Sequence, residues 1–187
     1  MRVRSDAAIA TRQRILDAAT ALLTAHLRSD IHLDMVAAGA QVSVQTIMRI
    51  FGSRAALLEQ AGQQVSQHIR HQRDSAAPGD IAGAIAGLFV HYEEIGDLVI
   101  RNLAQEDDPT VQPGLRIGRV QHRQWVERHF GPQLARHDAA TRDQLVDALV
   151  CVCDVYTWKL LRRDMARSRE DAESTMILMV TAVLGEP

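Results

Sequence analysis

Three polar side chains that can bind nucleic acid, Gln45, Thr46 and Arg49, recur at helical spacing within the segment 44–51. The apolar residues of this segment fall on the other side of the same period, which predicts a short helix with one buried face: Val44, Ile47, Met48 and Phe51. Glutamine and arginine can form paired hydrogen bonds with base edges in the major groove, and threonine can contact a phosphate or a thymine methyl group. The pattern therefore predicts recognition of double-stranded DNA by this face.

Turn and capping residues define the ends of this helix. The preceding segment has its own small apolar face, which predicts a second short helix before a turn at 41–43: Leu33, Met35, Val36 and Ala40. The Ser43 hydroxyl can accept from the unpaired amides that follow it, and Gly52 ends the helix. Arg54 then begins another helix, where a cation beside unpaired amides can contact a phosphate. We predict a helix-turn-helix with these DNA-contacting residues: Ser43, Val44, Gln45, Thr46, Met48, Arg49 and Arg54.

Together with Thr11-Arg12-Gln13-Arg14-Ile15-Leu16-Asp17-Ala18-Ala19, the segment 40–58 resembles the DNA-binding domain of the tetracycline-repressor (TetR) family of regulators. The family pattern is T-R-x-x-I-L-x-A-A followed by A-G-V-S-x-x-T-L-Y-x-H-F-x-S-K-x-x-L-L. The resemblance covers about a third of the chain. It implies a homodimer that binds a DNA operator as a repressor and is released by a small-molecule effector.

Four positions depart from the family pattern. Gln41 replaces the turn glycine, which places a side chain where the backbone often needs a positive φ. Met48 and Ile50 replace a tyrosine and a histidine that would donate to phosphates, and Asp34 stands where arginine is common. Because phosphate neutralisation dominates affinity for nucleic acid, these changes predict weaker DNA binding than is typical of the family.

Helical periodicity continues through the rest of the 187 residues, and no alternating strand pattern of useful length appears. We predict an all-α fold, with an N-terminal three-helix helix-turn-helix DNA-binding domain over residues 1–54. A larger C-terminal helical domain for ligand binding and dimerisation follows over residues 55–187. The predicted helices lie near 9–27, 54–73, 80–93, 95–106, 111–130, 138–164 and 168–184. Gly83 and Gly87 are one helical turn apart, which favours the close approach of another helix.

Charge and composition suit a cytoplasmic protein with one anionic partner. The first 75 residues carry nine basic and six acidic side chains, whereas the remainder carries 12 and 17. Since no run approaches the roughly 20 apolar residues of a membrane span, and the N-terminus lacks a signal-peptide core, we expect no membrane partner. Cys151 and Cys153 project nearly opposite ways at helical spacing, so we expect two small buried hydrophobes and no disulfide.

The last two predicted helices carry more apolar surface than a small core requires, which indicates self-association. The resemblance implies the same arrangement, in which the two C-terminal helices of each subunit pair. We therefore predict a homodimer interface that contains the following residues: Leu149, Val152, Tyr156, Met176, Met179, Val180 and Val183.

An effector site is predicted among the helices that precede and include the first of these two. Aromatic and apolar residues there recur at helical spacing, and a few polar residues interrupt the apolar pattern, where each would need a hydrogen-bonding partner. The predicted ligand-binding residues are Phe89, Tyr92, Ile100, Leu103, Ile117, Gln121, Gln124, Trp125, Asp154 and Trp158. We expect a mostly apolar organic effector that is held by one or two hydrogen bonds.

No pattern of catalytic or metal-binding residues appears, so we expect no enzymatic activity, no cofactor and no metal. His68 and His71 share a helix face, but their neighbours are polar and favour a solvated surface. Two functions remain open. The first is a ligand-responsive transcriptional regulator. The second, indicated by Asp34, Met48 and Ile50, is a helical dimeric small-molecule-binding or protein-interaction module with little DNA affinity.

Overall fold

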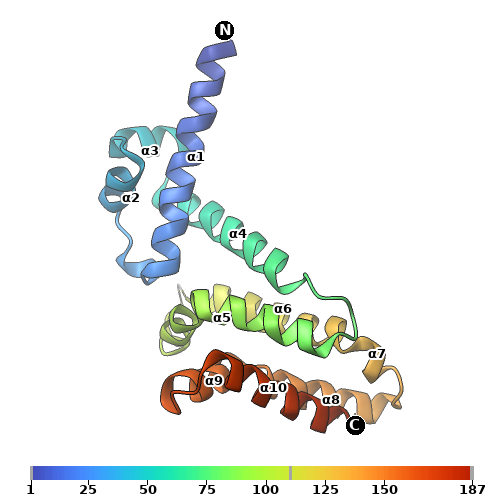
Figure 1. The fold of residues 1–187 in the computed structure, drawn as a ribbon. Coiled ribbons are helices and arrows are strands. Elements are labelled where there is room, and N and C mark those ends of the chain that lie inside the picture. Colours follow the sequence, from blue (N-terminus) through green and yellow to red (C-terminus); the bar gives the residue numbers. More distant parts are fainter. Residues whose placement is uncertain (1, 110, 186–187) are drawn as a thin grey trace. The chain divides into compact units, whose positions relative to one another are not determined.

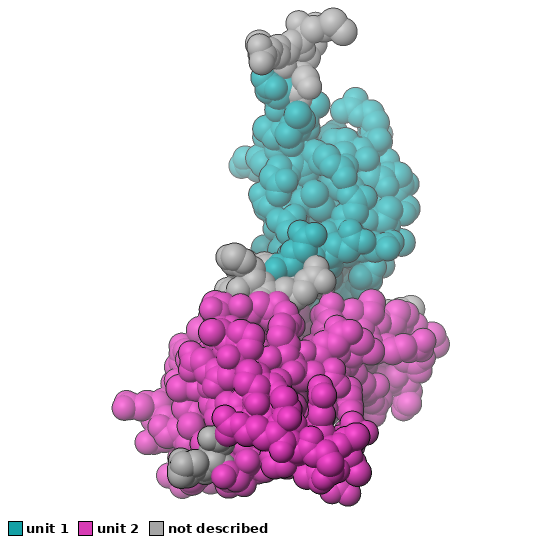
Figure 2. Space-filling view, turned by 90° about the vertical axis from the view of Figure 1, so that its right-hand side faces the viewer, with its two compact units in different colours: residues 1–69 teal, residues 70–187 magenta. Residues whose placement is uncertain are grey.

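A computed structural model describes residues 2–109 and 111–185, except for the side chains of 2–5, 66 and 68–72. The prediction for His68 and His71 therefore lies outside the described side chains. The chain divides into two compact units, unit 1 (1–69) and unit 2 (70–187), which are coloured separately in Figure 2.

Every regular element of the described residues is helical, as predicted for an all-α fold (Figure 1). A 3-10 turn spans Arg28–Asp30 and a π-helical turn spans Leu160–Asp164. The α-helices are α1 (Arg2–Ala25), α2 (Leu33–Ala40), α3 (Val44–Phe51), α4 (Arg54–Arg73), α5 (Ile81–Leu103), α6 (Gln112–His129), α7 (Gly131–Leu134), α8 (Ala139–Val152), α9 (Val155–Lys159) and α10 (Arg169–Leu184).

The core of unit 1 joins α1, α2 and α3 to the beginning of α4. Its buried side chains come from all four helices and from Ile31, which precedes α2: Ile15, Ala19, Ile31, Val36, Ala37, Ala40, Ile47, Phe51, Leu57, Leu58 and Ala61. The division between the two compact units thus lies later in the chain than the predicted boundary after residue 54. Because Leu57, Leu58 and Ala61 are buried with the first three helices, the first part of α4 belongs to unit 1, and the division falls after Ile69.

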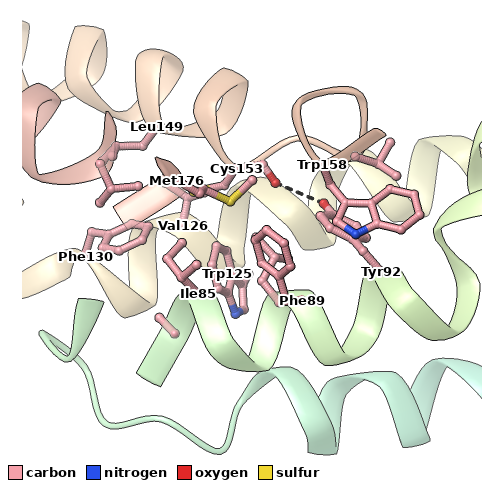
Figure 3. Packing of buried hydrophobic residues seen from close by; sticks show 14 of the residues in the cluster. Ile85, Phe89, Tyr92, Trp125, Val126, Phe130, Leu149, Cys153, Trp158 and Met176 are labelled. Carbon is pink, nitrogen blue, oxygen red and sulfur yellow. Dashed lines mark hydrogen bonds between the residues drawn. The ribbon is translucent and has the colours of Figure 1, made fainter. Parts of the chain in front are cut away.

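Unit 2 contains two packed layers, α5 with α6 and α8 with α9 and α10 (Figure 1). Helix α5 contacts α10 and α9, and α6 contacts α8. Large side chains fill the space between the layers, among them Phe89, Trp125, Phe130 and Trp158 (Figure 3). In the same core the Tyr92 hydroxyl donates to the carbonyl oxygen of Cys153 over 3.0 Å.

Two predicted helices merge into one at α5. The patterns 80–93 and 95–106 form a single helix, and Gly96 lies inside it without ending it. Gly96 instead allows the Trp158 ring to approach, since a Cβ atom at this position would lie 2.5 Å from Trp158 Cζ3. The sequence predicted that another helix would approach at Gly83. The atoms nearest to a Cβ added there belong instead to Asp80, the N-cap of the same helix.

The predicted helix 138–164 is interrupted after α8. Asp154 caps α9, and its carboxylate accepts from the backbone N–H of Tyr156 over 2.8 Å. The π-helical turn follows α9 directly. Aspartate favours such N-cap positions because its side chain satisfies an amide that has no partner within the helix.

Candidate functional site

The turn between α2 and α3 has the geometry that the sequence predicts. Gln41 adopts a left-handed conformation with φ 54° and ψ 49°, which confirms the expected positive φ at this position. The amide of Val42 donates to the carbonyl oxygen of Ala37 over 3.0 Å and closes the end of α2. Ser43 then caps α3, because its hydroxyl accepts from the amide of Thr46 over 3.2 Å. Two eight-residue helices thus meet across a tight, hydrogen-bonded turn.

The exposed face of α3 is formed by Gln45, Met48 and Arg49. Ile47 is fully buried and Phe51 is nearly so, which fixes the inward face of the helix. Met48 was predicted to pack inward, yet 42% of its surface is exposed. It directly follows the buried Ile47, so its side chain is rotated by about 100° around the helix axis, toward Arg49. Of the remaining predicted contacts, Val44 and Thr46 are half-buried and the Ser43 hydroxyl is used by the cap.

A hollow of about 630 Å³ lies between α1 and α3 within unit 1. Arg12 and Arg49 both line it, and Thr11 and Ile50 lie on its wall. The guanidinium carbon of Arg12 lies 4.6 Å from the centroid of the Phe51 ring, which holds this cation beside α3. A second positive charge therefore adjoins the exposed face of α3, although only the family resemblance drew attention to Arg12 in the sequence.

The guanidinium of Arg54 donates to backbone carbonyl oxygens within unit 1. Its Nε donates to the carbonyl oxygen of Ile31 over 2.7 Å, and its Nη2 donates to the carbonyl oxygens of Arg28 and Ser29. These contacts attach the start of α4 to the segment between α1 and α2. Arg54 therefore has a structural role, which leaves fewer guanidinium donors for a phosphate, and its DNA contact stays a prediction.

The predicted ligand-binding residues do not converge on one site. Phe89, Tyr92, Trp125 and Trp158 are core residues with at most 4% of their surface exposed, and Asp154 caps α9. Ile100 and Leu103 pack half-buried against the same core. On α6, Gln124 and Ile117 are exposed and Gln121 is half-buried, since the inward face of this helix is formed by His122, Trp125, Val126 and His129.

Unit 2 contains a buried polar cluster that the sequence prediction missed. Nη2 of Arg73 lies 3.1 Å from Nδ1 of His122, and Nε2 of His122 lies 3.1 Å from the carbonyl oxygen of Val150. The indole N–H of Trp125 donates to the carbonyl oxygen of Arg73 over 3.1 Å. The Arg73 guanidinium carbon also lies 5.0 Å from the centroid of the Trp125 ring. The sequence does contain one signal of this cluster, because His122 and Trp125 are three residues apart and therefore share a helix face.

Burial and positive charge shift the titration of this cluster. Burial lowers the pKa of His91 well below its usual value, and Arg73 and His122 lower this pKa further. The pKa of His122 is lowered by burial and then by Arg73. Burial raises the pKa of Cys153 to about 12, so its thiol is protonated at neutral pH. The imidazoles of His91 and His122 are therefore neutral near pH 7, whereas Arg73 keeps its charge, because arginine remains protonated at neutral pH.

Three of the predicted dimer-interface residues belong to the core of unit 2. Leu149, Met176 and Val180 have no exposed surface, so they cannot contact a second subunit. Val152, Met179 and Val183 are partly buried against the same core, and Tyr156 is 53% exposed. Other large apolar side chains are exposed nearby in the chain, Leu160 and Met165 at the two ends of the π-helical turn and Leu178 on α10.

The cysteine prediction is only half right. Cys153 is buried and Cys151 is exposed, and both thiols are free. Among the described residues, no group of three His, Cys, Asp or Glu side chains has an arrangement that could hold a metal ion. None of the described helices combines the length and the apolar character needed to cross a membrane.

No family model, curated protein or solved structure matches this chain.

Proposed function

We propose that this protein is a ligand-responsive transcriptional regulator of the TetR type. In this proposal a homodimer binds a double-stranded DNA operator and is released from it by a small molecule. The observation that carries the proposal is the exposed face of α3, where Gln45, Met48 and Arg49 project outward next to a tight turn. A short helix with such a face fits the major groove, where Gln and Arg read base edges and Met can contact a thymine methyl group.

The surroundings of α3 support this orientation. Arg12 lines the same hollow as Arg49, so a phosphate near the C-terminal part of α3 would contact two cations. In the proposed dimer the two α3 helices would lie about one DNA turn apart, roughly 34–36 Å. The exposed apolar residues Tyr156, Leu160 and Leu178 are our candidates for the surface that joins the two subunits.

Binding to DNA from beside the protein's own gene tests the proposal, measured by electrophoretic shift at several salt concentrations. Arg49→Ala should weaken binding to the cognate sequence by about 1–3 kcal/mol without lowering the melting temperature. Arg54→Ala should instead lower the melting temperature, because its partners are carbonyl oxygens within unit 1. Arg116→Ala is the matched control for Arg49→Ala, since Arg116 is an exposed arginine of unit 2.

A second function is favoured by the weak positive charge around the turn. Asp34 is exposed in the first turn of α2, and the half-buried Arg54 donates to backbone carbonyls. Both features suit a helical dimeric small-molecule-binding or protein-interaction module with little DNA affinity. Asp34→Asn separates the two functions, because it should raise affinity for any duplex, more at low salt than at high, only if α2 lies near phosphates. No shift with any duplex at low salt would favour the second function.

A further inference from the structure

Arg73 is a buried cation in unit 2, with only 8% of its surface exposed. No carboxylate among the described residues pairs with it. The nearest acidic neighbour along the chain, Asp74, forms its ion pair with Arg128 over 2.6 Å. Asp74 acts on the Arg73 guanidinium electrostatically without forming an ion pair with it. A buried charge without a paired partner is strongly disfavoured, so a buried guanidinium normally has an anionic partner.

Two buried nitrogen atoms of this cluster have no hydrogen-bonding partner among the described residues. Nη2 of Arg73 already donates to His122, and its Nε is buried without an acceptor among the described residues. Nδ1 of His91 is also buried without a partner in the described part of the chain. Arg73 and His122 both act electrostatically on His91, so side chains from α4, α5 and α6 contribute to one cluster. Such a cluster can take an acceptor with negative charge.

The apolar surroundings restrict the kind of anion that fits. Trp125 lies beneath the guanidinium and Tyr92 packs against the His91 ring, with the two ring centroids 5.2 Å apart. Figure 3 shows Trp125 among Ile85, Phe89 and Val126, with its indole nitrogen turned away from Leu149. A planar carboxylate can bind a guanidinium through two parallel hydrogen bonds, and its organic part can pack against aromatic rings. Inorganic phosphate offers no apolar part for these rings.

We propose that Arg73, together with His91 and His122, binds a small organic carboxylate. Binding itself needs no DNA, whereas a role of this carboxylate as effector rests on the proposed function. Arg73 supplies the charge, His122 orients the guanidinium through Nδ1, and Trp125 supports it from below. His91 supplies a further polar atom, because its Nδ1 is buried and has no partner among the described residues.

Thermal unfolding and titration calorimetry of the full chain test this site. The probes are benzoate, cyclohexanecarboxylate and hexanoate at about 10 mM, a concentration at which even a weak ligand of the native state raises the melting temperature. Benzamide has the shape of benzoate without its charge, and inorganic phosphate has the charge without an organic part. We expect at least one carboxylate to bind and to raise the melting temperature, with little effect from benzamide or phosphate.

Arg73→Met keeps the length of the side chain and removes its charge. If Arg73 is an anion receptor, this variant should be at least as stable as the wild type without ligand, and its affinity for the carboxylate should fall at least tenfold. Arg123→Met is the matched control, because Arg123 lies next to His122 on α6 but is exposed and paired with Asp147. This control should keep the affinity of the wild type.

Several outcomes would overturn the site. They are a wild type that none of the three carboxylates stabilises, equal binding of benzamide, binding of phosphate alone, and unchanged carboxylate affinity in Arg73→Met. Failure of the proposed regulatory function would give different results from failure of the carboxylate site. A carboxylate that binds the wild type and not Arg73→Met supports the site even where no duplex is bound, whereas DNA binding without carboxylate binding supports only the regulator.

Discussion

Arg73 and His122 are hydrogen-bonded with 3.1 Å between Nη2 and Nδ1, and this contact determines the protonation of the imidazole. An arginine can only donate, so Nδ1 must accept and carries no proton. Nε2 then carries the proton and donates to the carbonyl oxygen of Val150. Protonation of Nδ1 would place two donors against each other inside the core of unit 2.

Stability should therefore fall in mild acid. Burial and Arg73 lower the pKa of His91 and of His122 in the folded protein, whereas both imidazoles titrate near 6.5 in the unfolded chain. The unfolded chain binds more protons below this pH, so the contribution is complete above about pH 6.5 and is lost as the pH falls toward the folded pKa. The expected loss approaches about 1.4 kcal/mol per pH unit for each imidazole, measured by urea unfolding between about pH 7.5 and 5.5.

His122→Gln provides the control, because glutamine keeps an acceptor for Arg73 and does not titrate. The pH dependence of this variant should be shallower than that of the wild type. The remaining slope should come from His91 and from His129, whose pKa is lowered by burial and by Arg128. Equal free energies of unfolding at both ends of the pH range would contradict the prediction.

Replacing Gln41 by glycine should stabilise unit 1. Gln41 has φ 54°, a conformation that costs a side chain with Cβ about 1 kcal/mol and that glycine adopts freely. We expect Gln41→Gly to raise the free energy of unfolding by roughly 0.5–1 kcal/mol in urea titrations. Gln45→Gly, in the right-handed helix α3, should lower it by a similar amount, and the opposite ranking of the two variants would show that the turn is not strained at Gln41.

Gly96→Ala should disrupt the packing between α5 and α9. The new Cβ would lie 2.5 Å from Trp158 Cζ3, and the Trp158 ring is fully buried and unable to move away freely. Overpacking of this kind costs typically about 1–3 kcal/mol, which urea unfolding and tryptophan fluorescence can measure. Gly118→Ala is the control, because no atom lies within 4 Å of its added Cβ and alanine favours a helix. A Gly96→Ala variant as stable as the wild type would show that Gly96 is not needed for the contact between α5 and α9.

Two residues of α10, separated by one position, should distinguish dimerisation from folding. Leu178 is 69% exposed and Val180 is fully buried, although both belong to one helix. If the proposed homodimer uses this surface, light scattering should give about twice 20.7 kDa for the wild type and 20.7 kDa for folded Leu178→Glu. Val180→Glu should unfold unit 2, because it buries an unpaired charge. A dimeric Leu178→Glu would move the interface elsewhere.

Local signals in the sequence determined the helical character of the chain and the turn between α2 and α3, although not where each longer helix begins and ends. Ser43 caps α3 and Gln41 takes a positive φ, because both depend on the backbone of a few consecutive residues. The buried face of α3 likewise follows from the spacing of Ile47 and Phe51. These features need no distant partner, so periodicity and capping chemistry suffice to predict them.

Only the tertiary structure decided which side of each longer helix faces the core. On α6 the sequence prediction selected Gln121 and Gln124, whereas His122 and Trp125 face inward, since one residue corresponds to a rotation of about 100°. On α10 the same ambiguity assigned Val180 to an interface and overlooked Leu178. Arg54 and Arg73 depend on partners more than 20 residues away, a backbone carbonyl for one and His122 for the other. Because folding alone brings such groups together, no spacing in the sequence could reveal the two roles. One arginine attaches α4 to the segment before α2, and the other is buried without an ion pair to any described carboxylate.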